Sequence, residues 1–383
     1  MDSAFSDHFN GRLKQVFLYI TDRCNIACEQ CIYKPNITYS EKREIPLPVA
    51  QNLLETFFSM GARKVTFLGG EPTLYDLESN NESLLQLIAA AKAIGYQHVR
   101  LDTNGQFTHL LESERFRILD EIAFSVDGYD SESNDGLRGT NTFRNSCRNI
   151  RRAVSLGVRS TITCCIHRRL LNRNIAGQLG IEQMIRFAES LGVSGINFHD
   201  LFKAGVPMDT WTGSFDTSVA DHMQMYYEIR NQIEKGGFQI PVRLPQCFVS
   251  KEEFKLNPEY YGYCPVKLAE RVMVHPNGVI RICSNLICSA FGVGRYFDNT
   301  IEWDRTAANE TRGHQLGEMT PCTNRSKNKS YGNAVPLCFS FKPNQDEYAW
   351  RDLDWDSKRT VSINPPPSDV SVRRRIPRLG VLA

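Results

Sequence analysis

The chain has 383 residues and a formal net charge of +2, with 45 Lys and Arg against 43 Asp and Glu. Hydrophobic residues make up 41% of the sequence and charged residues 23%, a composition typical of soluble domains with a buried core. The balanced charge argues against nucleic-acid or membrane-surface partners, and no apolar segment has the length of a signal sequence or membrane span. We therefore expect a cytoplasmic protein.

Six short β-branched segments alternate with helix-period segments between residues 14 and 237. Helices are expected in segments such as 48–61, 82–95 and 180–192, and the glycines that follow are expected to close helices in the left-handed conformation. The pattern predicts an α/β fold, a partial (β/α)6 TIM-like barrel, with its chemistry at the carboxyl ends of the strands. The expected strands are residues 14–21, 64–69, 98–103, 121–126, 159–166 and 195–200, and the glycines are Gly61, Gly95, Gly157 and Gly192.

The pattern changes near residues 238–245 to irregular sequence with many Cys, Asn and Gly residues. We expect a barrel domain over residues 1–240, a smaller loop-rich domain over 241–350 and a tail over 351–383. The tail contains runs of Pro and Arg and is expected to be mobile.

Twelve cysteines in a chain without a secretion signal favour metal-binding or catalytic roles over disulfides. Cys24, Cys28 and Cys31 form a C-x3-C-x2-C motif directly after the first expected strand. Three thiolates leave one iron of a four-iron cluster open to an outside ligand, whereas four would close the site.

This motif, with Tyr33 after the last cysteine, resembles the defining motif of the radical SAM superfamily. The resemblance implies a [4Fe-4S] cluster on the three cysteines, with the amino and carboxylate groups of S-adenosylmethionine on the open iron. It further implies reduction by a flavodoxin- or ferredoxin-type partner and cleavage of S-adenosylmethionine to methionine and a 5′-deoxyadenosyl radical. A zinc knuckle or unliganded core thiols are the alternatives.

The second expected strand ends in Gly69, Gly70, Glu71 and Pro72, which resemble the GGEP element of the same superfamily. The resemblance implies that this element lines the methionine amino group. Glycines allow the backbone to approach a ligand closely, and Pro72 stiffens the turn.

Polar residues at the ends of the third and fourth expected strands resemble the groups that surround S-adenosylmethionine in the superfamily. They are Asn104, Ser125 and Asp127, and Arg138 in the segment GLRGTNTF resembles the arginine that contacts the methionyl carboxylate. Asn-Gly and Asp-Gly are also common turn dipeptides, so a purely structural role is the alternative.

The fifth and sixth expected strands end near Ile166, His167 and Asp200. Ile166 is expected beside the cofactor. His167 or Asp200 is a candidate to take a proton from a substrate radical, since both groups are tunable toward neutral pH. Core or turn roles are the alternative for both.

A second set of cysteines resembles the auxiliary-cluster domains of the superfamily, called SPASM in the long form and twitch in the short form. The dense downstream cysteine run of the long form is missing, so the short form is expected, with one auxiliary [4Fe-4S] cluster; a structural zinc is the alternative. A β-hairpin with a tight turn at Asn277-Gly278 is expected to bring two ligands together. The expected ligands are Cys264, Cys283, Cys322 and Cys338, with Cys247 and Cys288 as rivals.

The expected reaction is hydrogen abstraction followed by dehydrogenation of a small polar metabolite, such as a sugar or antibiotic intermediate. Hydrogen return from Cys247, as in epimerases of the superfamily, would instead give epimerisation. The first alternative is a maturase that crosslinks or modifies a ribosomally made peptide, and the remote alternative is a non-enzymatic zinc-binding protein.

Overall fold

The computed structural model of the protein describes residues 13–31, 33–34, 37–38, 43–200, 217–245, 248–250, 252, 256, 270–282, 292–297, 300–304 and 334–336. The strands are β1 (Gln15–Thr21), β2 (Lys64–Gly69), β3 (His98–Thr103), β4 (Glu121–Ser125), β5 (Ser160–Ile166), β6 (Gly195–Asp200), β7 (Val242–Arg243), β8 (Phe248–Ser250), β9 (Arg271–Val274), β10 (Val279–Arg281), β11 (Gly294–Phe297), β12 (Thr300–Trp303) and β13 (Ala334–Pro336). The α-helices are α2 (Leu47–Ser59), α3 (Glu82–Ile94), α4 (Glu114–Arg117), α5 (Ser131–Arg138), α6 (Thr142–Ser155), α7 (Arg168–Leu171), α8 (Gly180–Ser190) and α9 (Val219–Glu234), and the 3-10 turns are η1 (Pro72–Leu74), η2 (Leu77–Ser79) and η3 (Leu110–Glu112).

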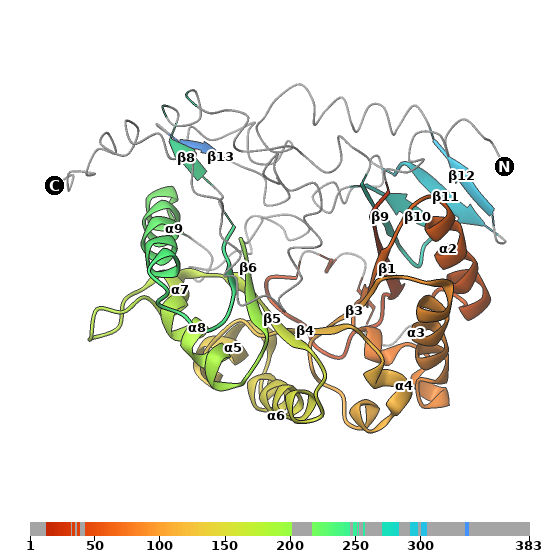
Figure 1. The fold of residues 1–383 in the computed structure, drawn as a ribbon, viewed down its shortest axis with the longest axis horizontal. Coiled ribbons are helices and arrows are strands. Elements are labelled where there is room, and N and C mark those ends of the chain that lie inside the picture. Colours follow the sequence, from red (N-terminus) through yellow and green to blue (C-terminus); the bar gives the residue numbers. More distant parts are fainter. Residues whose placement is uncertain are drawn as a thin grey trace.

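Eleven of these strands form one sheet in the order β12-β11-β10-β9-β1-β2-β3-β4-β5-β6-β7, and β8 pairs with β13. Strands β1 to β7 run parallel, which requires the helical crossovers that the chain supplies between them. Figure 1 shows the sheet curved, with helices α2 to α8 along its outer side. The predicted α/β class with a parallel sheet is confirmed.

Alternating side chains give the sheet one apolar and one polar face. In β3, Val99 and Leu101 are fully buried, whereas His98, Arg100 and Asp102 on the opposite face are partly exposed. The apolar side packs against the outer helices, because their amphipathic faces need a partner surface. The concave face is therefore left to polar chemistry.

The six expected strands coincide with β1 to β6 to within one residue at each end. The four glycines expected to close helices, Gly61, Gly95, Gly157 and Gly192, all have positive φ. Strand β7 and strands β9 to β12, which extend this sheet at its two edges, were not predicted as part of it.

The hairpin of β9 and β10 confirms one prediction and corrects another. The strands pair antiparallel, but the His275 amide donates to the Val279 carbonyl across a three-residue loop. The predicted tight turn at Asn277-Gly278 is present, but only Gly278 takes positive φ, at 82°, so the positive φ expected for Asn277 as well was wrong. The Asn277 side chain instead accepts a hydrogen bond from the Val279 amide at 3.1 Å.

Strands β9 to β12 come from the predicted second domain, yet they continue the sheet of the first, because β9 pairs parallel with β1. The domain boundary near residue 240 stays a prediction. The tail and the six cysteines proposed for the auxiliary cluster lie outside the described residues.

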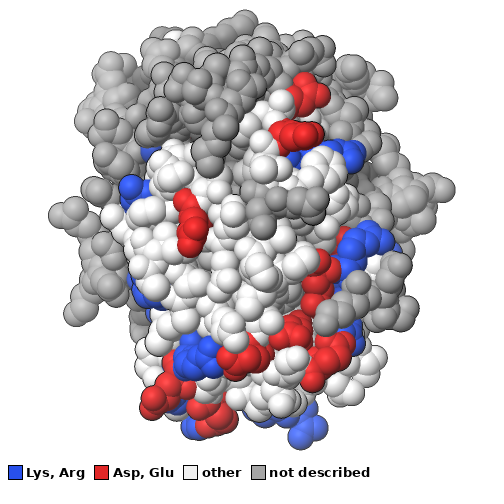
Figure 2. Space-filling view, turned by 90° about the vertical axis from the view of Figure 1, so that its right-hand side faces the viewer, with Lys and Arg blue, Asp and Glu red and all other residues white. Residues whose placement is uncertain are grey.

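None of the helices in the described part of the chain combines the length and the apolar character needed to span a membrane. On the face shown in Figure 2, acidic and basic side chains lie next to each other around a largely uncharged area. Among the described residues of that face, no extended patch of one sign is seen.

Candidate active site

The three cysteines of the motif lie on the loop that leaves β1. Backbone hydrogen bonds hold this loop, from the Cys24 amide to the Thr38 carbonyl and from the Glu29 amide to the Leu137 carbonyl, both 2.9 Å. Cys24, Cys28 and Cys31 are free cysteines, with Cys24 buried and the other two partly buried.

Burial raises the pKa of these thiols. The pKa of Cys24 rises to about 12 and that of Cys31 to about 11, and burial raises that of Cys28 as well, opposed by the Arg138 guanidinium. Iron displaces the proton from a coordinating thiol, so these buried groups fit a cationic cluster. No trio of Cys, His, Asp or Glu in the described chain is arranged around a single metal ion, and a cubane takes one thiolate per iron instead.

Glycines beneath the loop explain how it approaches β2. A Cβ added to Gly69 would lie 2.2 Å from the Thr21 carbonyl oxygen, and one added to Gly70 would lie 2.3 Å from the Arg23 carbonyl oxygen. The expected close approach is therefore present, but its partner is the chain's own cysteine loop. Contact between this element and a cofactor stays a prediction.

Glu71 joins the ends of β2 and β3. It is fully buried, and its carboxylate accepts hydrogen bonds from the Thr103 hydroxyl and the Asn104 amide, both at 2.7 Å, and from Thr73. Burial raises the pKa of Glu71, and these donors act against that rise. Pro72 begins the following turn, η1, as a stiffening residue would.

Asn104 reaches from the end of β3 to the cysteine loop. Its side-chain amide donates to Asn25 Oδ1 at 2.8 Å and lies 4.0 Å from Cys24 Sγ. Ser125, at the end of β4, is half-buried beside Thr163 of β5. Both predicted residues thus lie at the edge that carries the cysteines.

Asp127 is the centre of the polar network beside that loop. Its Oδ2 accepts hydrogen bonds from Gln30 Nε2 and Arg138 Nη1, both at 2.6 Å, and its Oδ1 accepts from the Cys165 amide at 2.7 Å. The Asp127 side chain is 1% exposed and that of Arg138 10%, so this is a buried ion pair. The sequence analysis predicted Asp127 and Arg138 as separate site residues and did not predict the ion pair between them. It missed Gln30, although Gln30 lies inside the cysteine motif.

Two atoms of this network have no hydrogen-bond partner among the described residues. They are Arg138 Nε, a donor, and Gln30 Oε1, an acceptor, and both are buried. Buried polar atoms are normally satisfied, so an unpaired donor and an unpaired acceptor beside Cys28 fit a ligand that offers both kinds of group. The α-amino and carboxylate groups of S-adenosylmethionine are such a pair.

His167 follows β5 and is 1% exposed. Its Nε2 lies 2.7 Å from the Asp127 carbonyl oxygen, which can only accept, so Nε2 carries the proton in the neutral ring. Nδ1 then holds a lone pair, and it is buried without a partner in the described chain. Burial lowers the pKa of His167 and thereby favours the neutral ring.

The structure describes Ile166 and Tyr33 among the other predicted residues, but not the Asp200 side chain or Cys247. Ile166 ends β5 in the core, paired in register with Asp200, whose side chain is outside the described part, as is all of Cys247. The Tyr33 hydroxyl hydrogen-bonds to that of Tyr19, which stacks on His275 with ring centroids 4.3 Å apart. An aromatic contact thus joins the cysteine loop to the β9–β10 hairpin, and only the tertiary fold reveals it.

The fold and the site together form an α/β domain with a three-cysteine loop at the carboxyl end of its first strand. Residues 18–172 match the family model described as Radical SAM superfamily. Residues 18–172, less than half of the chain, are therefore a radical SAM domain. A domain of this family implies a [4Fe-4S] cluster and S-adenosylmethionine as cofactors.

Similar sequences include GTP 3',8-cyclases. The protein of Psychromonas ingrahamii is 29% identical over 158 residues, which are 41% of this chain and 45% of that protein. The protein of Synechococcus elongatus is 27% identical over 341 residues, 82% of this chain and 95% of that protein. The chain thus spans less than half of the first relative and nearly all of the second.

Solved structures share the fold at low sequence identity. Streptococcus suis SuiB bound to S-adenosylmethionine has a TM-score of 0.60 at 15% identity, covering 82% of this chain and 71% of that one. The tagged anSMEcpe structure with bound AdoMet has a TM-score of 0.56 at 16% identity, covering 78% of this chain and 80% of that one.

Proposed function

We propose that the protein reductively cleaves S-adenosylmethionine at a [4Fe-4S] cluster held by Cys24, Cys28 and Cys31, and directs the resulting radical to a small polar substrate. The observation that carries the proposal is the buried Asp127 network beside Cys28, with its unpaired Arg138 and Gln30 atoms. When bound, the cluster supplies the electron that splits the cofactor into methionine and a 5′-deoxyadenosyl radical.

The residues around the cysteine loop are proposed to bind and orient S-adenosylmethionine. Arg138 offers Nε to a carboxylate while its Nη1 stays on Asp127, so the guanidinium is already fixed before the cofactor arrives. Gln30 offers Oε1 to an ammonium or amino group in the same way. Burial of Cys24 excludes water from the side of the loop that faces Asn104.

His167 is the proposed proton acceptor for the substrate radical. The unprotonated Nδ1 and the lowered pKa fit a base that is neutral before the reaction. Asp200 remains a second candidate from the neighbouring strand end.

We propose a small-molecule substrate and two possible fates for its radical. Relatives named GTP 3',8-cyclase, a ring-forming activity on a small polar molecule, support a small-molecule substrate. Dehydrogenation follows if a proton and an electron leave the radical, and epimerisation follows if Cys247 returns a hydrogen atom. An auxiliary [4Fe-4S] cluster on Cys264, Cys283, Cys322 and Cys338 would take the electron in the first case.

A peptide substrate is the second candidate. One structural neighbour, SuiB bound to precursor peptide SuiA, has a TM-score of 0.59 over 85% of this chain. Retention of a precursor peptide by the purified protein would favour this candidate, and turnover of a free small molecule would exclude it.

The deciding experiment measures iron and sulfide after anaerobic reconstitution, and 5′-deoxyadenosine after reduction with dithionite. Wild type is compared with a Cys24→Ala/Cys28→Ala/Cys31→Ala variant. A fall from about eight to about four irons, with loss of 5′-deoxyadenosine, supports one catalytic and one auxiliary cluster. Zinc in place of iron, without cleavage, contradicts the proposal and favours the zinc-binding alternative.

A further inference from the structure

A cysteine outside the three-cysteine motif lies at the carboxyl edge of the sheet, where the candidate active site is. Cys165 is the next-to-last residue of β5, and the alternation of a strand turns it to the opposite side from Cys164. Cys164 is fully buried in the hydrophobic core, whereas Cys165 is partly exposed. The two neighbouring thiols therefore have different surroundings.

The face that carries Cys165 is the polar, concave face of the sheet. Asp102 of that face pairs in register with Ala123, and Ser125, two residues further along β4, pairs with Thr163. Residues paired in register point to the same face, and so do residues two apart on one strand. Cys165, two residues after Thr163, therefore shares the concave face with Ser125 and Asp102.

The Asp127 network holds the backbone at Cys165. The Cys165 amide donates to Asp127 Oδ1 at 2.7 Å, while Asp127 Oδ2 accepts from Gln30 and Arg138. The thiol itself is close enough to the Asp127 carboxylate, the Arg138 guanidinium and Cys28 for all three to act on its pKa. Cys165 is therefore part of the same site as the cysteine motif.

Three atoms bound to this network indicate a ligand beside the thiol. Gln30 Oε1, Arg138 Nε and His167 Nδ1 are buried and have no hydrogen-bond partner among the described residues. The three residues are 5%, 9% and 1% exposed. Buried polar atoms are normally satisfied, so a bound molecule with complementary groups accounts for all three.

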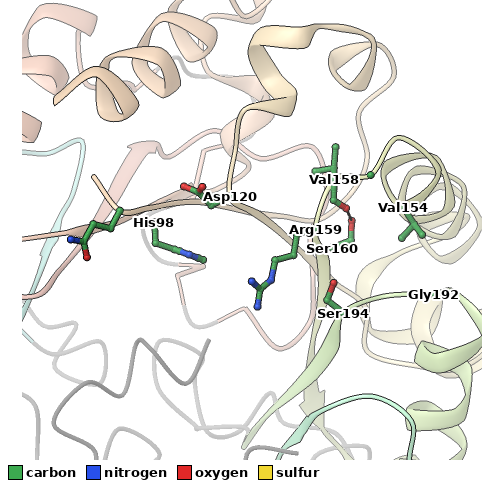
Figure 3. Close-up of a pocket in the computed structure, with 10 residues that line it drawn as sticks. His98, Asp120, Val154, Val158, Arg159, Ser160, Gly192 and Ser194 are labelled. Atoms are coloured by element: carbon green, nitrogen blue, oxygen red, sulfur yellow. Dashed lines mark hydrogen bonds between the residues drawn. The ribbon is translucent and has the colours of Figure 1, made fainter. Parts of the chain in front are cut away.

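The cavity drawn in Figure 3 lies at the other end of the strands. Its volume is about 660 Å³, and its lining includes His98, Ser160 and Ser194. Ser160 begins β5, and Cys165 lies five residues further on, about 16 Å at about 3.3 Å per residue. That cavity is therefore remote from Cys165, and the thiol belongs to the end of the sheet that carries the cysteine loop.

A protonated thiol in this place is able to quench a carbon radical, because an S–H bond is weaker than most C–H bonds. The S–H bond breaks, a C–H bond forms, and the unpaired electron is left on sulfur. One electron from a flavodoxin- or ferredoxin-type reductant and one proton from solvent then restore the thiol. Burial raises the pKa of Cys165 well above its ordinary value, so the thiol keeps its hydrogen at neutral pH.

We propose that Cys165 is the hydrogen-atom donor to carbon radicals formed at this site. The proposal rests on the proposed cleavage of S-adenosylmethionine and extends it, because hydrogen return is the step that separates epimerisation from dehydrogenation. Cys247, which lies outside the described residues, is the rival donor.

The test follows deuterium into 5′-deoxyadenosine. The reconstituted full-length protein is incubated with S-adenosylmethionine and dithionite in D2O, without added thiol or substrate, so that the protein thiols carry deuterium. The 5′-deoxyadenosyl radical then takes its atom from the donor, and mass spectrometry measures the monodeuterated fraction of the product. Wild type is compared with Cys165→Ser, Cys165→Ala and Cys247→Ser, and Cys164→Ala on the opposite face of β5 is the matched control.

We expect monodeuterated 5′-deoxyadenosine to be the main product of wild type and of Cys164→Ala. Its fraction should fall at least about tenfold in both Cys165 variants, because a positioned donor outcompetes distant ones. The fraction is a ratio, so a lower cluster content in a variant does not change it. Unchanged deuterium in the Cys165 variants, or loss of deuterium in Cys247→Ser alone, would overturn the proposal.

The same samples separate this proposal from the proposed function. Unlabelled 5′-deoxyadenosine from wild type rejects only the thiol donor. Absence of 5′-deoxyadenosine from wild type rejects the proposed function, and the thiol donor with it.

A second measurement needs no turnover. The unreduced protein is treated with N-ethylmaleimide, and fragmentation of the tryptic peptide 160–168 in the mass spectrometer distinguishes the two neighbouring thiols. Cys165 should react faster than Cys164, and saturating S-adenosylmethionine should slow the reaction of Cys165. Reaction of Cys165 no faster than that of Cys164, or no slowing by S-adenosylmethionine, would contradict the position that the proposal gives to this thiol.

Discussion

Asp127 shows how one buried carboxylate can fix several parts of a site. Its two oxygens hold Gln30 from the cysteine loop, Arg138 from α5 and the Cys165 amide from β5. Asp127→Asn removes the charge and leaves the Arg138 guanidinium buried without its counter-ion. We expect the free energy of unfolding to fall by about 3–5 kcal/mol, measured by urea denaturation, and iron content to fall with it.

The matched control for Asp127 is a second ion pair that involves α5, the helix that carries Arg138. Glu132 also pairs with an arginine, Arg169, at 2.9 Å, but its side chain is 81% exposed. Glu132→Gln should therefore change the unfolding free energy by less than about 1 kcal/mol and leave iron content unchanged. Equal effects of the two substitutions would mean that burial of the Asp127 pair does not matter.

The protonation state of His167 is a second prediction at this scale. Because burial lowers its pKa below the ordinary 6.5, the ring should be more than half neutral at pH 6.5, where a free imidazole is half protonated. Nitrogen-15 spectra of histidine-labelled protein should show the tautomer protonated at Nε2, with assignment by loss of the signal in His167→Gln. A doubly protonated ring at pH 6.5, or a proton on Nδ1, would contradict the proposed base.

The approach of the cysteine loop to β2 depends on a position without a side chain. A Cβ at Gly70 would meet backbone, the Arg23 carbonyl oxygen at 2.3 Å, and backbone cannot give way without moving Cys24. Gly70→Ala should therefore reduce bound iron after reconstitution by more than half, with secondary structure retained in circular dichroism spectra.

Gly136 in α5 provides the comparison, because a Cβ added there has nothing within 4 Å. Gly136→Ala should keep full iron content and raise the unfolding free energy by about 0.5–1 kcal/mol, since alanine restricts the unfolded chain and favours the helix. Normal iron binding by Gly70→Ala would show that the loop position is not set by this contact.

Local sequence patterns predicted the elements well and their distant partners poorly. Strands β1 to β6 follow from alternating apolar residues and flanking glycines, which are local signals. The pairing of β1 with β9 joins Gln15 to Arg271, and no local signal encodes a contact across such a separation. The same limit applies to Gln30 and Asp127, which are 97 residues apart, so spacing identified the cysteines and not the network that supports them.

The arrangement of the whole sheet separates two kinds of chemistry. Parallel strands place all their carboxyl ends at one edge, where the cysteine loop, Glu71 and Asp127 meet. The amino ends lie at the opposite edge, where Lys64 is paired in register with His98, one of the residues that line a polar cavity. Substitutions at one end should therefore leave the other end intact, as independent sites do.

Lys64 also makes the stability of the whole molecule depend on pH. Its pKa is about 7 in the folded protein and near 10.5 when exposed, so between these values the unfolded chain binds a proton that the folded chain lacks. The free energy of unfolding should therefore gain a contribution that rises with pH from about 7 to about 10. Buried thiols and phenols such as Cys165 and Tyr96, whose pKa values are raised, act in the opposite direction above pH 8.

The contribution of Lys64 is isolated by comparing wild type with Lys64→Met, because the other groups titrate alike in both proteins. Urea denaturation at pH values from 6.5 to 10 should show the unfolding free energy of wild type rising relative to that of Lys64→Met as the pH increases. Parallel pH curves for the two proteins would mean that Lys64 keeps its ordinary pKa in the folded state and has a counter-charge there.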